Sequence, residues 1–200
     1  FYQFSASLNT HWFLDHGQGN QRAGATGWAV LKNYLCSKLA WDVNADVNEL
    51  TKKFFDNFYG EVADEMYSIY SSFRGYSKYL IEEGEIARLG SIFSTIERAE
   101  YWPKTLLLTW YETIQNALET IKPIRFSDIK RYNELYSHIV MERVSVAYLL
   151  VQLYQDDLPT EFVTKLKYDC KADCELVGID KTAERASATV MSLWQLWGIA

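Results

Sequence analysis

The residues best suited to chemistry lie close together in one polar segment near the N-terminus, residues 9–21. The segment has no helical period and contains an aromatic ring, a carboxylate, imidazoles and amides, namely His11, Trp12, Asp15, His16, Gln18, Asn20 and Gln21. Aromatic faces stack on the C–H surfaces of sugar rings, and planar polar groups bind sugar hydroxyls. This pattern predicts a carbohydrate-binding loop, although the turn-forming residues of an ordinary polar loop give a similar composition. The residues that we expect to contact the carbohydrate are His11, Trp12, Asp15, His16 and Gln18.

The same loop does not predict a metal site or a complete active site. His11, Asp15 and His16 carry metal-ligating groups, but their spacing matches no recognised metal motif. Glycoside hydrolysis normally needs two carboxylates, and Asp15 is the one loop carboxylate that we identify. The sequence contains no nucleophile-elbow, phosphate-loop or dinucleotide motif, so we expect no cofactor. The chain by itself is therefore a poor enzyme.

Composition excludes two classes of partner. The net charge is −6 and the pI is near 5.1, so no basic surface is available for nucleic acid. No apolar run approaches the roughly 20 residues that span a bilayer. Aromatic residues make up 16% of the chain, which is high, and such residues are common where sugars or partner proteins bind. The chain starts at Phe1 and shows no signal peptide, which is expected of a processed form, a truncated form or a fragment.

From about residue 26 onward the hydrophobic periodicity is helical. The pattern predicts a mainly α protein, a bundle of about six helices joined by short loops. The predicted helices cover 28–41, 46–59, 61–83, 103–122, 127–154, a segment from Thr160 onward, and a last one from Thr182 to about Trp197. Residues 1–8 differ, because they alternate and are aromatic, which predicts a short strand.

Local signals support several of these helices. Residues 28–41 are apolar enough to indicate a helix buried on several sides. Asp46 and Glu49 have the spacing of a capping box, and Gly60 suits the left-handed position that ends the helix. Pro103 is expected at the first position of its helix and Ser127 at the cap of the longest one.

Two other groups of residues are interpreted as structural. Cys170 and Cys174 lie one helical turn apart in line with apolar residues, so we expect core packing rather than metal binding or redox chemistry. Cys36 lies on an apolar helix and has the same interpretation. Arg143 falls where an apolar residue is expected, which indicates a buried acidic partner or a position at the helix edge.

A resemblance to a known family rests on the segment that follows the strand and the polar loop. Its sequence is GWAVLKNYLCSKLAWDVNADVNELTKKFFDNFYGEVADEMYSIY, with a Leu-x-Trp-Asp step at 39–42, an acidic helix cap at Asp46 and an aromatic-Tyr-Gly corner at 58–60. This arrangement resembles the end of the catalytic barrel and the start of the C-terminal helical region in bacterial α-glucuronidase-like glycoside hydrolases. It is most similar to an uncharacterised family associated with polysaccharide utilisation, and the match covers roughly residues 1–75.

The resemblance implies a division of the chain into two parts. Residues 1–41 would hold the last strand, loop and helix of a (β/α)₈ barrel, and residues 42–200 would form the C-terminal helical bundle. The loop would then lie at the carboxyl end of the barrel, where such barrels bind substrate. The catalytic carboxylates would lie in an upstream barrel domain, the carbohydrate could contain uronic acid, and the protein would be periplasmic or secreted.

Three hypotheses for function follow. The first is the C-terminal helical region of a glycoside-hydrolase-like protein acting on polysaccharide, which supports the barrel and contributes the substrate-contacting loop. The second is a non-catalytic helical interaction or dimerisation module, with Trp194 and Trp197 as surface aromatics that dock against a partner or a second copy. A free-standing enzyme is the third interpretation, and the missing second carboxylate argues against it.

Overall fold

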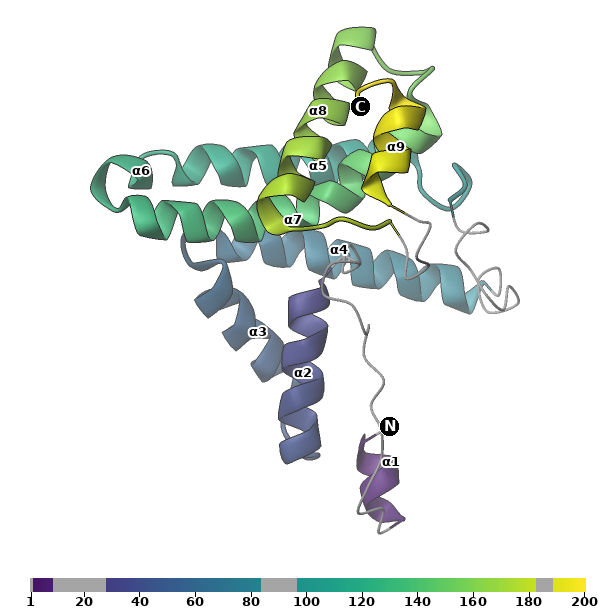
Figure 1. Cartoon of the computed structure of the whole chain (residues 1–200). Helices are drawn as coiled ribbons and strands as arrows, with labels where there is room; N and C mark the ends of the chain where they lie inside the picture. Colours follow the sequence, from purple (N-terminus) through teal and green to yellow (C-terminus); the bar gives the residue numbers. More distant parts are fainter. Residues whose placement is uncertain (1, 9–27, 84–96, 183–188) are drawn as a thin grey trace.

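The computed structural model describes residues 2–8, 28–83, 97–182 and 189–200, and these residues are mainly helical (Figure 1). The described residues contain no β-strand, and their only β-type pairing is an isolated antiparallel bridge between Lys181 and Thr189. The predicted mainly α fold, a helical bundle, is confirmed. None of the helices in these ranges is both long and apolar enough to cross a membrane.

The helices differ widely in length, from a single turn to seven turns. In chain order they are α1 Tyr2–Ser7, α2 Ala29–Trp41, α3 Val47–Phe58, the 3₁₀ helix η2 Gly60–Val62, α4 Ala63–Glu82, α5 Lys104–Ile121, α6 Ile124–Ser127, α7 Ile129–Tyr154, α8 Thr160–Val177 and α9 Val190–Trp197.

The centre of the molecule is the antiparallel pair of α5 and α7, joined by the short helix α6 (Figure 1). On one side of this pair lie α8 and α9, and on the other side lies α4. Helices α2 and α3 project beyond α4, away from α8. This order of layers makes α7 a central helix, since it packs against both α5 and α8.

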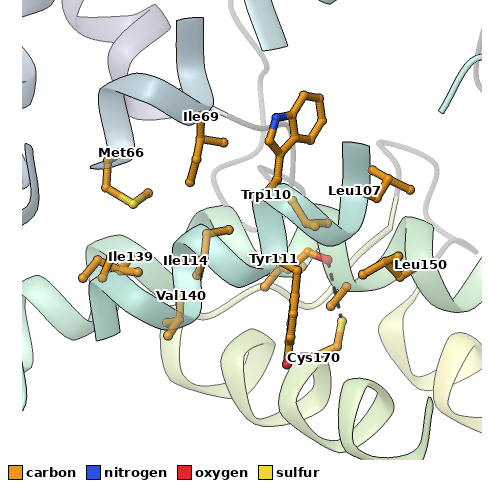
Figure 2. Close-up of a cluster of buried hydrophobic side chains, with 14 of the residues drawn as sticks. Met66, Ile69, Leu107, Trp110, Tyr111, Ile114, Ile139, Val140, Leu150 and Cys170 are labelled. Carbon is orange, nitrogen blue, oxygen red and sulfur yellow. Dashed lines mark hydrogen bonds between the residues drawn. The ribbon is translucent and has the colours of Figure 1, made fainter. Parts of the chain in front are cut away.

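The hydrophobic core fills the space between α4, α5, α7 and α8 (Figure 2). Its members alternate between the facing helices and are almost fully buried: Met66, Ile69, Leu107, Trp110, Tyr111, Ile114, Ile139, Val140, Leu150 and Cys170. Burial of apolar surface stabilises such a core by about 25 cal/mol for each Å² removed from water. The apolar stripes predicted for these helices therefore face one another.

The local signals around α3 are confirmed. The Asp46 carboxylate accepts hydrogen bonds from the backbone N–H groups of Asn48 (2.7 Å) and Glu49 (3.1 Å), which have no partner within the helix. Gly60 follows the helix with a φ of 49°, the left-handed conformation in which a side chain is strained.

The predicted strand at residues 1–8 is wrong, because Tyr2–Ser7 forms the helix α1. A single strand leaves its backbone N–H and C=O groups without partners, whereas a helix pairs them within the segment. The Ser7 hydroxyl also donates a hydrogen bond to the carbonyl of Phe4 (2.7 Å). The alternation of apolar residues in this segment therefore does not decide its conformation.

Three predicted helix starts are displaced. Asp128, not Ser127, caps α7, and its Oδ1 accepts a hydrogen bond from the N–H of Arg131 (2.9 Å). Pro103 lies at the N-cap of α5, one residue before the predicted position. The last helix, expected to start at Thr182, is α9, which starts at Val190 after a Thr189 cap.

Two predictions of burial are also wrong. Helix α2 was expected to be buried on several sides, but Leu31 is its one buried residue. Trp194 and Trp197 were expected on the surface, but they are 2% and 6% exposed and pack on each other with ring centroids 5.5 Å apart. Their apolar rings complete the core beside α8, so they are not available as docking residues.

Candidate functional site

The predicted carbohydrate contacts His11, Trp12, Asp15, His16 and Gln18 lie outside the described residues. The carbohydrate-binding loop therefore stays a prediction. Within the described ranges, no three His, Cys, Asp or Glu side chains are grouped closely enough to hold a metal ion.

The described residues line a partly open aromatic cavity of about 140 Å³ between α4, α5 and α7. Its lining is mostly apolar and includes three tryptophans and one carboxylate: Trp28, Ile69, Phe73, Trp102, Trp110, Ile114, Glu142, Ser145, Val146 and Leu149. We call this set of residues the Glu142 pocket. Small-molecule sites commonly have this character, an apolar concavity with few polar groups.

One wall of the Glu142 pocket is a packed group of rings. Phe73 and Trp102 lie nearly parallel with centroids 6.3 Å apart, and Trp110 meets Trp102 edge-to-face at 6.4 Å. The Trp110 indole N–H donates to the Ser72 hydroxyl (3.0 Å). Because that polar group has its partner, the Trp110 ring is held in one orientation.

The ionisable group in the described lining of the pocket is the carboxyl group of Glu142 on α7, which is 6% exposed. Its Oε2 accepts a hydrogen bond from the backbone N–H of Trp28 (2.8 Å), and its Oε1 accepts one from the Tyr59 hydroxyl (3.4 Å). Burial raises the pKa of Glu142 to about 7, and the two hydrogen bonds and the positive charge of Lys32 oppose that shift. Near neutral pH this carboxyl group can therefore exist with or without its proton.

The backbone of Trp28 has an unusual conformation. Its φ of 62° and ψ of 28° are left-handed, which is rare for a bulky residue and costs on the order of 1–3 kcal/mol. The bond from its N–H to Glu142 helps to hold this conformation, and its ring lies 5.4 Å from Tyr70 and 5.6 Å from Phe55. Strained residues of this kind often occur at binding sites.

Glu142 has a signal in the sequence that was missed. Ile139 and Val146, three residues before it and four after it, are both buried, so Glu142 lies on the apolar face of α7. A carboxylate at such a position needs either a partner or a protonated form.

The prediction for Arg143 is confirmed, because Arg143 has a buried acidic partner on α8. Its Nε and Nη2 donate to the Oδ2 and Oδ1 of Asp173 at 2.7 and 2.8 Å, and Asp169 lies 3.7 Å away. Burial alone would lower the pKa of Arg143, but the bonds and charge of Asp173 raise it. This pair is closed on itself and joins α7 to α8, which indicates a structural role.

The three cysteines differ in how deeply they are buried. Cys170 and Cys174 are free thiols in the core, as predicted, and hydrogen bonding to Cys174 together with burial raises the pKa of Cys170 far above the ordinary value. Cys36 is half-buried on α2 rather than a core residue. The Cys170 thiol lies 4.0 Å from the carbonyl oxygen of Val144 (Figure 2).

Comparison of the chain with protein-family models, with curated proteins and with solved structures gives no match. The candidate site is therefore interpreted from its own geometry.

Proposed function

We propose that this chain is the C-terminal helical region of a glycoside-hydrolase-like protein acting on polysaccharide, and that α2 packs against the barrel domain of that protein. The observation that supports the proposal concerns α2, whose sequence is AVLKNYLCSKLAW. This helix is rich in apolar residues, yet most of them are not buried. A helix that is apolar on all sides is normally covered on all sides. Here Leu31 alone is buried, and Trp41 is 93% exposed.

The exposed part of α2 has the features of a contact surface. Leu35, Cys36 and Leu39 are half-buried, and the Trp41 ring is exposed at the C-terminal end of the helix. Exposed apolar regions of this kind mark interaction sites. The charged residues of α2 are Lys32 and Lys38, so a neutral or mildly acidic apolar layer would suit it.

The alternative is a non-catalytic interaction or dimerisation module, which the exposed side of α2 supports equally well. In that case a second copy of the chain would cover α2. Trp194 and Trp197 no longer support this alternative, because both are buried.

Cys36 provides a direct test of what covers α2. It is half-buried on α2, whereas Cys170 and Cys174 are buried, so a maleimide should label Cys36 first in the folded chain. A Cys36→Ser variant is the matched control and should not be labelled until it unfolds. The experiment compares the labelling rate of this chain with that of the protein encoded by the whole parent gene.

Slow labelling in the longer protein, together with βα repeats encoded upstream of Phe1, is the result expected from the proposal. Equal rates in the two proteins would remove α2 from the contact. Labelling that slows as the concentration of this chain rises, with light scattering showing a dimer, would favour the module instead.

The carbohydrate part of the proposal concerns Trp12 and is tested separately. Saturation-transfer NMR with uronic-acid oligosaccharides should give signals with the wild-type chain, and weaker signals with Trp12→Ala, because the stacking surface is lost. Equal signals from both proteins would exclude Trp12 from the site.

A further inference from the structure

We propose that the Glu142 pocket binds a small organic cation, an ammonium group that carries a compact apolar body. The cation would lie among the rings of Trp28, Trp102 and Trp110 with its charge toward the Glu142 carboxylate. This proposal is independent of what covers α2.

The size of the cavity limits the ligand. Its volume is about 140 Å³. An apolar protein cavity of about 150 Å³ holds one benzene molecule. The ligand is therefore comparable to a single small ring or a short branched chain.

The lining favours a cation over a sugar of similar size. Among the described residues of the lining, the polar side chains are Glu142 and Ser145, and the others are aromatic or aliphatic. Each buried sugar hydroxyl would need its own partner, and burial without one is costly. An ammonium group needs one anion and electron-rich ring faces, which attract cations most strongly when water is excluded.

The carboxylate has acceptor capacity for such a ligand. Glu142 accepts one short hydrogen bond from Trp28 and one long bond from Tyr59, at 2.8 and 3.4 Å. A carboxylate offers about four acceptor positions, so these bonds leave room for a further donor. Lys32 acts on Glu142 through its charge, while the hydrogen bonds to the carboxylate come from Trp28 and Tyr59.

The contrast with Arg143 supports this assignment. Asp173 neutralises Arg143 through two short hydrogen bonds, so the buried charge of Arg143 needs no ligand to balance it. Glu142 is equally buried, yet its hydrogen-bond donors are a backbone amide and a phenol, which carry no charge. In addition to the charge of Lys32, a cation in the adjacent cavity would place a second opposite charge beside the carboxylate.

The test compares two ligands of matched shape, cyclopentylammonium and cyclopentanol. Tryptophan fluorescence and calorimetry should show the cation binding to the wild-type chain about tenfold or more tightly than the alcohol. Equal affinities would overturn the proposal, and so would the absence of binding by either ligand at millimolar concentration.

Glu142→Gln removes the negative charge and keeps a hydrogen-bond acceptor for the N–H of Trp28. This variant should bind the cation about tenfold more weakly and leave the alcohol unchanged. Glu134→Gln is the matched control, because it removes an exposed carboxylate from the same helix. A cation preference that survives in Glu142→Gln would overturn the proposal.

A pH titration of the wild-type chain keeps the test decisive if Glu142→Gln does not fold. In the part of the chain that the structure describes, the titratable groups around Glu142 are Lys32 on α2, Tyr59 after α3, and His138 one turn earlier on α7, whereas α4 and α5 contribute apolar lining. The preference for the cation over the alcohol should fall at acid pH, where Glu142 is protonated. A preference that stays constant from weakly acidic to weakly alkaline pH would overturn the proposal.

Discussion

Two adjacent ionisable residues of α7, Glu142 and Arg143, are buried against different neighbours, and their charges have different kinds of partner. Arg143 forms a bidentate pair with Asp173 on α8, whereas Glu142 accepts hydrogen bonds from uncharged donors. The charge of Arg143 is neutralised by Asp173, whereas the free-energy cost of burying the Glu142 charge is only partly offset by its hydrogen bonds. This difference predicts distinct consequences for substitution.

Breaking the Arg143–Asp173 pair should be strongly destabilising. Arg143→Met or Asp173→Asn alone leaves one buried group without its partner and should lower the free energy of unfolding by about 3–5 kcal/mol. The double variant Arg143→Met/Asp173→Leu should lose far less, since no charge is left buried. Urea unfolding measures all three, with Lys52→Met in the exposed Lys52–Asp56 pair as a control that should cost less than about 1 kcal/mol. Single variants that behave like this control would contradict a structural role.

Glu142 should make the stability of the chain depend on pH. Its pKa in the folded state, about 7, lies above the ordinary 4.5, so the folded state holds the proton more tightly than the unfolded state. The resulting stabilisation is fully present below about pH 4.5 and is lost as the pH rises through about 7. Glu142→Gln should therefore gain stability relative to wild type between about pH 5 and 8, by up to about 3 kcal/mol.

Urea unfolding of both proteins at several pH values measures that difference. The contribution of His138, whose pKa is lowered by burial, is common to both proteins and cancels. Any fixed cost of the Gln side chain shifts the difference equally at each pH. A difference that does not change with pH would show that Glu142 titrates normally.

At the scale of elements, the predictions that succeeded depend on local chemistry. The carboxylate of Asp46 caps the helix that begins one residue later, and the flexible backbone of Gly60 ends it, so both are readable from a few residues. The apolar stripes of α5, α7 and α8 were also predicted, because their periodicity is set by the helix itself. Arg143 and Cys170 could be assigned because each lies on such a stripe.

The predictions that failed concern what an element packs against. Periodicity identifies an apolar face but not the element that packs against it. Helix α2 was therefore expected to be covered, but it is largely exposed, and Trp194 was expected to be exposed, but it is buried. The segment 1–8 was misassigned because a strand needs partners that the pattern does not reveal. The Glu142 pocket was missed for the same reason, since its walls come from separate helices.

The junction between α3 and η2 gives a prediction at this scale. Gly60 and Gly178 both have positive φ, 49° and 75°, so an alanine at either position should cost about 1 kcal/mol of backbone strain. At Gly60 the new Cβ would also overlap the guanidinium of Arg131, which forms an ion pair with Glu61 at 3.0 Å. At Gly178 no atom lies within 4 Å of that position.

Gly60→Ala should therefore be more destabilising than Gly178→Ala when the two are compared by thermal or urea unfolding. Adding Arg131→Ala to Gly60→Ala should remove the excess, because the overlapping side chain is gone. Equal losses in the two single variants would mean that Arg131 moves aside freely.

At the scale of the whole molecule, burial is distributed unevenly between the central helices and the edge. Helix α7 lies between α5 and α8 and places residues such as Ile139, Ala147 and Leu150 fully out of water. Helix α2 projects beyond α4 (Figure 1) and buries Leu31 alone. Since local unfolding is easiest where few apolar contacts are lost, α2 should open far more readily than α7.

Amide hydrogen exchange followed by mass spectrometry should show this difference. Exchange in α2 should be fast and should change little in mild denaturant, whereas exchange in α7 should require global unfolding. Leu31→Ala should speed exchange in α2 further and leave α7 almost unchanged, because Leu31 is the most deeply buried contact of α2 with the core. Equal protection of α2 and α7 would mean that α2 is already covered in this chain. Protection of α2 that rises only in the longer protein would support the proposed barrel contact, because a partner that binds the folded helix stabilises it against opening.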